Sequence, residues 1–204
     1  MTATKERQRG PGRPSTGAKE RVLEAGLETL LEEGYAGLTY AKVAGRAGEN
    51  KSLISYYFDS KQGLVGAVAG LVGERITGEV LEEIRGTTRV DDLTEGLVSG
   101  LWKVMDEDLR IARLYFDLSA VSVIDDQVRF ALREVKARWR VVIASYLAKA
   151  QVPAEEIDAA SVYLLAGMEG LAIERLDEEE PERLEKARAL FVRAAALAIT
   201  PDGR

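Results

Sequence analysis

Hydrophobic and polar positions along this 204-residue chain repeat with the three- to four-residue spacing of amphipathic α-helices. No stretch of four or more residues alternates clearly between apolar and polar side chains, as a half-buried β-strand would. Glycine, aspartate and proline separate the repeats at positions that suit helix ends. The sequence therefore predicts an all-α fold. The long helices are expected at residues 18–33, 63–85, 91–106, 109–123, 126–150, 154–175 and 181–199.

Two further, short helices are predicted in the stretch LTYAKVAGRAGENKSLISYYFDSKQGL, residues 38–64. Thr39 can cap the first helix, because its hydroxyl can accept a hydrogen bond from an unpaired backbone N–H. Leu38 and Val43 occupy the two positions of a hydrophobic staple around that cap. Gly48 follows where a left-handed turn residue is needed. The pattern indicates a short helix followed by a tight turn.

The second short helix begins after Asn50, which can cap it, and it places Ile54 and Phe58 four residues apart on one buried face. The other side chains must cover its outer and lateral faces; they are Lys51, Ser52, Leu53, Ser55, Tyr56 and Tyr57. A cation, hydroxyls, an apolar tip and two phenols can contact phosphates, base edges and thymine methyls. The two helices are thus a candidate helix-turn-helix for DNA, and a purely structural helix pair is the alternative.

The same stretch resembles the operator-binding domain of TetR-family repressors. The matching positions, in order and spacing, are Thr39, Val43, Ala44, Ala47, Gly48, Lys51, Ile54, Tyr57, Phe58, Ser60, Lys61 and Leu64. The resemblance extends upstream to the predicted helix 18–33, which would be the first helix of that domain. It implies a three-helix DNA-binding domain at residues 18–62 and an antiparallel helical ligand-binding and dimerisation domain at residues 63–200.

The resemblance also implies roles for single residues. Side chains that would face the major groove are those of Lys51, Ser52, Leu53, Ser55 and Tyr56. Side chains that would hold phosphates are those of Thr39, Lys42, Tyr57 and Lys61. Two positions depart from the family pattern. Glu49 replaces an apolar residue ahead of the recognition helix and would repel phosphate, and Ser55 replaces a common tyrosine, which removes one DNA contact.

Residues 1–17 form a basic segment rich in glycine, proline and serine, with hardly any apolar side chain. Such a segment cannot offset its own ordering entropy, and we expect a disordered arm. Within it, Gly12-Arg13-Pro14 resembles the centre of an AT-hook, in which an extended arginine lies in a narrow minor groove. Arg13 is therefore a candidate DNA contact, and a solvated tail is the alternative.

The distribution of charge fits this division. The net charge is −6, yet residues 1–64 hold ten Lys and Arg against eight Asp and Glu, a balance of +2. The remaining 140 residues therefore carry −8. The first part of the chain would then bind DNA, which is a polyanion, and the acidic remainder would have a role other than DNA binding.

The absence of cysteine and histidine from the sequence excludes disulfides, thiolate nucleophiles, imidazole bases and the usual zinc, haem and iron–sulfur ligand sets. We expect no catalytic residue, no metal site and no cofactor. The sequence shows neither an apolar run long enough to span a bilayer nor a signal-peptide core, so we expect a cytoplasmic protein without a membrane partner. An all-helical enzyme using carboxylates, or a protein–protein adaptor that no longer uses its helix-turn-helix, are the alternative classes.

The helix at 63–85 holds five glycines, and each interior one costs about 1 kcal/mol relative to alanine. These are Gly63, Gly66, Gly70, Gly73 and Gly78. The resemblance makes this the helix that links the two domains. Its glycines either let the helix bend when a ligand binds or allow neighbouring helices to approach closely, and the sequence leaves both interpretations open.

The helices at 154–175 and 181–199 carry apolar residues on more than one side. The resemblance implies that they pack against their two-fold mates as a four-helix bundle. The two recognition helices of such a homodimer would meet a palindromic operator at half-sites about 34–36 Å apart. A monomer with an intramolecular core is the alternative.

Large apolar side chains between these elements are candidates for lining a ligand cavity. They are Trp102, Met105, Tyr115, Phe116, Trp139, Tyr146 and Met168. Such groups suit an aromatic or lipophilic effector, although each could instead belong to the ordinary core. Asp117 and Glu169 lie in apolar stretches and could meet a cationic ligand, or else face solvent or the dimer seam. The resemblance, together with these candidate residues, implies a homodimeric repressor that leaves its operator when a small molecule binds.

Overall fold

The computed structural model describes residues 17–177 and 179–199, and these residues form nine α-helices and no β-strand. The helices are α1 (Ala18–Gly37), α2 (Tyr40–Ala47), α3 (Lys51–Phe58), α4 (Lys61–Glu83), α5 (Val90–Glu107), α6 (Leu109–Val121), α7 (Asp126–Lys149), α8 (Ala154–Asp177) and α9 (Pro181–Ile199). The predicted all-α class is confirmed. In this part of the chain, no helix has both the length and the apolar character of a bilayer-spanning segment.

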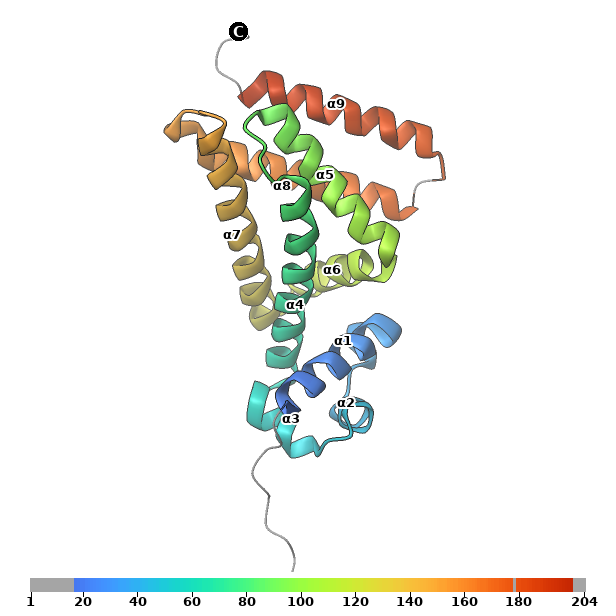
Figure 1. The fold of residues 1–204 in the computed structure, drawn as a ribbon. Helices are drawn as coiled ribbons and strands as arrows, with labels where there is room; N and C mark the ends of the chain where they lie inside the picture. Colours follow the sequence, from blue (N-terminus) through green and yellow to red (C-terminus); the bar gives the residue numbers. More distant parts are fainter. Residues whose placement is uncertain (1–16, 178, 200–204) are drawn as a thin grey trace, which may run out of the picture.

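The first three helices gather at one end of the molecule, and α4 runs from them into the remaining helices (Figure 1). In α1 the side chains of Val22 and Leu30 are buried against its neighbours. The helical backbone breaks at Gly34, which has φ 67° and ψ −177°, and one more turn follows before α1 ends. The predicted stop at Gly34 is therefore present as a kink inside a longer element.

Helices α2 and α3 have the caps that the sequence predicts. The Thr39 side chain accepts a hydrogen bond from the backbone N–H three residues on, at 3.4 Å, and Asn50 accepts one from the N–H two residues on, at 3.2 Å. Gly48 ends α2 in the left-handed conformation, with φ 65°. Ile54 and Phe58 are buried on the inner face of α3. These local signals fix the turn and decide which face of α3 is left outside.

The start of α4 differs from the prediction. The helix begins at Lys61, two residues before the predicted start, because the Ser60 hydroxyl accepts a hydrogen bond from the Gly63 N–H at 2.9 Å. Gly63 is needed at this joint, since a Cβ there would lie 2.0 Å from the Phe58 carbonyl oxygen. Apart from the end of α1, which lies four residues beyond the predicted residue 33, the other predicted boundaries of the long helices lie within two residues of the observed ones, and α9 has the predicted bounds.

The glycines of α4 lie mainly where the helix packs against α7. A methyl group on Gly73 would lie 2.7 Å from Val135 Cγ1, and one on Gly66 would lie 3.1 Å from Ala131 Cβ. These two positions support the interpretation as close helix packing, because a larger residue would push α7 away. Gly78 has open space around it, and bending of the helix stays a prediction.

Helix α4 belongs to both ends of the molecule. Its later turns pack against α5 and α7, and its first turns pack against α1, where Leu64 and Val68 lie close to Gly26. Helices α8 and α9 complete the far side by packing against α5, α7 and each other. The predicted division between residues 62 and 63 falls inside this continuous helix and stays a prediction. A displacement of α4 would change the helix packing at both ends of the molecule.

Candidate functional site

The outward face of α3 consists of Lys51, Ser52, Ser55 and Tyr56, which are all exposed; we call these four residues the outer face of α3. It lies at the narrow end of the molecule (Figure 1). Tyr56 is the most exposed large hydrophobic side chain of α3, at 69%. Leu53 is partly buried beside this face. The arrangement offers one cation, two hydroxyls and a phenol to a partner, as the sequence predicts for a groove-reading helix.

Two of the residues predicted to contact phosphate, Thr39 and Tyr57, also stabilise the fold. The Thr39 side chain caps α2. Tyr57 is partly buried, and its ring meets those of Tyr56 and Phe58 edge-to-face, with centroids 5.1 Å and 6.3 Å apart. The phenol of Tyr57 therefore stands at the border between core and surface. Arg13 lies outside the described residues.

The two lysines predicted to hold phosphates are engaged with α1. Lys42 forms an ion pair with Glu33. Lys61 donates from Nζ to the Tyr35 carbonyl oxygen at 2.8 Å, and its ammonium lies 4.4 Å from the centre of the Tyr35 ring. A phosphate contact by either lysine requires it to leave these partners. An exposed ion pair such as Lys42–Glu33 is worth about 1 kcal/mol or less, so this exchange is inexpensive.

Two acidic residues near the proposed DNA surface are neutralised in the same way. Glu49 forms an ion pair with Arg21 of α1, and its side chain is only 13% exposed. Arg46 pairs with Glu32, and its guanidinium lowers the pKa of that carboxyl group. The repulsion of phosphate expected from Glu49 is thus reduced by a contact between α1 and the turn before α3. Sequence spacing gave no sign of this contact.

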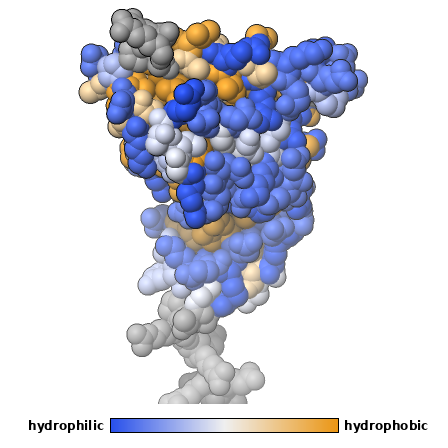
Figure 2. Space-filling view, turned by 45° about the horizontal axis from the view of Figure 1, so that its top comes forward, coloured by the Kyte–Doolittle hydropathy of each residue, from blue (hydrophilic) through white to orange (hydrophobic). Residues whose placement is uncertain are grey.

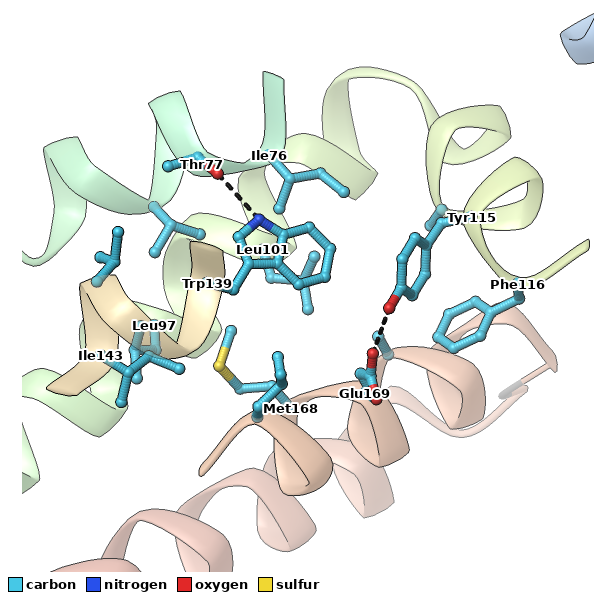
Figure 3. Close-up of a pocket in the computed structure, with 15 residues that line it drawn as sticks. Ile76, Thr77, Leu97, Leu101, Tyr115, Phe116, Trp139, Ile143, Met168 and Glu169 are labelled. Carbon is cyan, nitrogen blue, oxygen red and sulfur yellow. Dashed lines mark hydrogen bonds between the residues drawn. The ribbon is translucent and has the colours of Figure 1, made fainter. Parts of the chain in front are cut away.

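A central cavity lies among α4, α5, α6, α7 and α8 (Figure 3). Four of the predicted ligand-binding residues line it, namely Tyr115, Phe116, Trp139 and Met168. Glu169 also lines it. The remaining lining residues, which the sequence analysis did not single out, are Ile76, Thr77, Val80, Leu97, Leu101, Ala112, Val142, Ile143, Leu165 and Ala172. Aliphatic residues of this kind have the same sequence pattern as any helical core.

Three predicted ligand-binding residues lie elsewhere, and their placement in the cavity is corrected. Trp102 is covered by the Arg175 guanidinium, 4.8 Å from its ring centre. Tyr146 lies beneath the Lys149 ammonium, at 4.1 Å. Met105 is buried in the core away from the lining. Each is on a helix that borders the cavity, but the helix rotation turns its side chain to another neighbour.

The cavity is small as it stands, with a volume of about 50 Å³ for the centres of water-sized molecules. A single water needs about 10–15 Å³ by this kind of measure, so the space suits a few waters. A larger molecule can enter only if the lining helices or side chains move apart.

A pair of hydrogen bonds ties one wall of the cavity to α4. Trp139 of α7 donates from Nε1 to the Thr77 hydroxyl at 2.9 Å (Figure 3). This hydroxyl donates to the Gly73 carbonyl at 2.7 Å. The Trp139 ring also lies 5.3 Å from the centre of the Tyr115 ring of α6. A molecule that shifts this indole would disturb α4 directly.

The wall formed by α6 and α8 carries a charged cluster. The Tyr115 hydroxyl donates to the Glu169 carboxylate (Figure 3). Lys136 Nζ lies 2.9 Å from Glu169 Oε1. Burial and then the neighbouring Glu169 carboxylate raise the pKa of Tyr115, so its phenol stays protonated at neutral pH. Asp117, the other acidic candidate, is exposed on α6 and does not line the cavity.

An apolar surface is exposed on the last two helices. It consists of Val162 and Ile173 of α8, each 47% exposed, and Leu190 and Leu197 of α9, at 59% and 80%; we call it the α8–α9 face. Apolar surface gathers near the end of α9 in Figure 2, whereas polar residues cover much of the rest of that view. Several exposed apolar side chains on two neighbouring helices are typical of an interaction site.

Comparison with known sequences identifies relatives along most of the chain. The family model described as "Bacterial regulatory proteins, tetR family" matches residues 22–68, which run from α1 through α2 and α3 to the start of α4. The transcriptional regulator CymR of Pseudomonas putida is 24% identical over 173 residues, covering 82% of this chain and 84% of that protein. The regulator BetI of Cronobacter sakazakii is 24% identical over 190 residues, covering 90% and 93%.

The fold is also shared with solved structures. The multidrug binding protein EbrR, solved in complex with imidazole, superposes with a TM-score of 0.72 at 22% identity, over 93% of this chain and 94% of that one. The likeness in fold extends over the helices of both ends of the molecule, while the family match coincides with the helix-turn-helix and its outer face on α3. Residues 22–68 therefore match the TetR family of bacterial regulatory proteins, and over most of its length the chain is similar to HTH-type transcriptional regulators.

Proposed function

We propose that the protein is a homodimeric repressor that leaves a palindromic operator when a small molecule occupies the central cavity. The observation that carries this proposal is the position of α4. The helix contributes Ile76, Thr77 and Val80 to the cavity, and its other end follows α3 directly. A change in the cavity can thus reach the DNA-binding helices through one rigid element.

The size of the cavity gives the ligand a means of action. Because the space suits only a few waters, an effector must part the surrounding helices, and the form with separated helices then binds it better. A ligand shifts an equilibrium only by its differential affinity for the two states, and this cavity offers such a difference. The name of EbrR as a multidrug binding protein agrees with a small-molecule effector.

The proposed contacts with DNA follow from exposure. Lys51, Ser52, Ser55 and Tyr56 reach base edges and nearby phosphates, with Leu53 beside them. Thr39, Lys42, Tyr57 and Lys61 flank this surface and hold phosphates once the lysines exchange their partners on α1. Arg13 reaches the minor groove. Exchange of weak surface ion pairs for phosphate contacts gives binding that falls steeply with salt.

The proposed dimer uses the α8–α9 face. Pairing this face with its copy would bury its four apolar side chains, which are exposed in a single chain. A two-fold interface also places two copies of α3 on one side of a duplex, as reading two half-sites about 34–36 Å apart requires.

The test is a fluorescence-anisotropy titration on DNA from the region upstream of the protein's own gene, against a scrambled duplex, at two salt concentrations. We expect salt-sensitive binding with at least about a thousandfold preference for the genuine sequence. A compound screen on the complex then identifies ligands that release it. Weak and equal binding to both duplexes would contradict sequence-specific recognition of this DNA, and tight binding that no cavity-occupying ligand weakens would contradict the effector mechanism.

A further inference from the structure

The polar groups of the central cavity show what kind of ligand it can take. Four lining side chains have polar atoms, those of Thr77, Tyr115, Trp139 and Glu169. The donors among them are all in use. The Trp139 N–H binds Thr77, the Thr77 hydroxyl binds a backbone carbonyl, and the Tyr115 hydroxyl binds Glu169. A ligand therefore meets no free side-chain donor on the cavity wall.

The polar atoms that can still bind a ligand are hydrogen-bond acceptors, chiefly the oxygens of the Glu169 carboxylate. A carboxylate has about four acceptor positions. Tyr115 and Lys136 use some of them, with the Lys136 ammonium 2.9 Å from Oε1 and 3.0 Å from Oε2. The ligand group that fits this wall is a hydrogen-bond donor or a positive charge, and a carboxylate or sulfonate would meet like charge.

The rest of the wall agrees with a cation. Tyr115, Phe116 and Trp139 bring three aromatic rings to the cavity, and the faces of such rings attract positive charge. The other lining side chains are aliphatic or methionine, so they suit an apolar body attached to the charged group.

Lys136 now neutralises Glu169, but it stands outside the lining. Its side chain is 33% exposed, whereas that of Glu169 is 24% exposed. A lysine with a flexible stem at the protein surface can swing its ammonium into water at little cost. The two partners are thus unequal: the carboxylate belongs to the cavity, and the ammonium is the part that can leave.

Resting on the effector role proposed for this cavity, we propose that it binds lipophilic cations, with the Glu169 carboxylate as their counter-ion and the Lys136 ammonium as the group they displace. Tyr115 holds the carboxylate toward the cavity by its hydrogen bond, and Trp139 forms an aromatic wall. Because Trp139 is bonded to Thr77 of α4, the ligand's charge is recognised beside the helix that leads to α3.

Isothermal titration calorimetry on the full-length protein tests this with three compounds of matched shape. The cation is trimethyl(phenethyl)ammonium, the neutral analogue has a dimethylcarbinol group in place of the trimethylammonium group, and the anion is phenylethanesulfonate. We expect the cation to bind at least about tenfold more tightly than the alcohol, and the sulfonate to bind least. Release of operator DNA should follow the same order.

Three variants assign the preference to residues. Glu169→Gln should reduce the cation's advantage over the alcohol about tenfold, because the cation loses its counter-ion whereas the alcohol can still donate to the glutamine oxygen. Lys136→Met removes the competing ammonium and should raise the cation's affinity. Asp117→Asn is the matched control, because this carboxylate is close in sequence to Tyr115 but exposed outside the cavity, and it should change neither compound. Circular dichroism checks that each variant is folded.

The outcomes separate the two proposals. An alcohol that binds and releases DNA as well as the cation would overturn the cation preference and leave the effector site intact. A Lys136→Met variant with weaker cation binding would overturn displacement of the ammonium. Failure of all three compounds to bind the wild-type protein would overturn both the cation preference and the cavity as the effector site. If Glu169→Gln does not fold, the wild-type comparison and Lys136→Met still decide.

Discussion

The two ends of this molecule handle charge in opposite ways. In α1–α3, the cations Arg21, Lys42 and Arg46 pair with acidic residues at the surface, where each pair exchanges readily with water or phosphate. In the central cavity, the only lining carboxylate is held by a buried phenol within an apolar wall. The first arrangement suits a long polyanion met by many weak contacts. The second suits a small ligand met by a single strong one.

The largest expected effect comes from the small core beneath α3. Ile54 is fully buried there, so Ile54→Ala should lower the free energy of unfolding by about 2–5 kcal/mol and abolish DNA binding. Ile143→Ala is the matched change in the cavity wall, and it should cost less because that side chain already borders empty space. Urea unfolding of both variants measures the difference. Equal losses would show that the two ends do not differ in packing as proposed.

The next effect concerns the α8–α9 face. Leu197→Asp places a charge where the proposed dimer buries apolar surface, so light scattering should show monomers and operator affinity should fall at least about tenfold. Val141→Asp is the control, since Val141 is an exposed apolar residue of α7 outside that face, at 70%. A Leu197→Asp protein that keeps its wild-type mass would contradict the proposed interface.

A smaller effect is expected at the outer face of α3. Lys51→Ala should weaken DNA binding and reduce the salt dependence by about one charge if the ammonium contacts phosphate. Lys103→Ala removes an exposed lysine of α5, which pairs with Glu79 at 2.8 Å, and should leave the salt slope unchanged. Anisotropy titrations at several salt concentrations give both slopes. An unchanged slope for Lys51→Ala rejects its role as a phosphate contact.

The smallest expected effect concerns Asp125, which joins the two ends of the molecule through its contact with α1. Asp125 caps α7 and accepts a hydrogen bond from the Tyr35 hydroxyl of α1 at 3.3 Å. The N–H of Val128, then that of Gln127, lower the pKa of this carboxyl group from its ordinary 3.8. Its stabilisation is therefore complete above about pH 4 and is lost as the pH falls through the lower, folded-state pKa.

The variant Asp125→Asn keeps a capping oxygen but cannot titrate, so its stability should fall less than that of the wild type on acidification below about pH 4. Urea unfolding at pH values above and below this point measures the change. Parallel loss of stability in the two proteins would show that the cap does not contribute to the acid sensitivity.

Local signals explain which parts of the fold the sequence predicts. Thr39, Gly48 and Asn50 act through the backbone of their own turns, so the helix-turn-helix and the buried face of α3 follow from a few neighbouring residues. The start of α4 also depends on a local signal, because Ser60 caps the helix and the predicted start at Gly63 is therefore wrong by two residues. Helix existence and type depend on periodicity, and the all-α class was predicted correctly.

The candidate site is predicted only in part, because side-chain direction depends on how the helices rotate against one another. Trp102 and Tyr146 have the same chemistry as Trp139 and Tyr115, yet they contact Arg175 and Lys149 rather than the cavity. The pairing of Glu49 with a residue 28 positions earlier is likewise a product of the folded arrangement. No local pattern distinguishes such residues before the helices are packed.

The different surroundings of the two tryptophans make the protein its own optical sensor. The sequence holds only these two indoles, and one lines the cavity while the other is packed against Arg175 away from it. Ligand entry should therefore change the fluorescence of Trp139 and leave that of Trp102 as a constant internal reference. Binding could be followed in a plate reader without a dye, a labelled ligand or DNA.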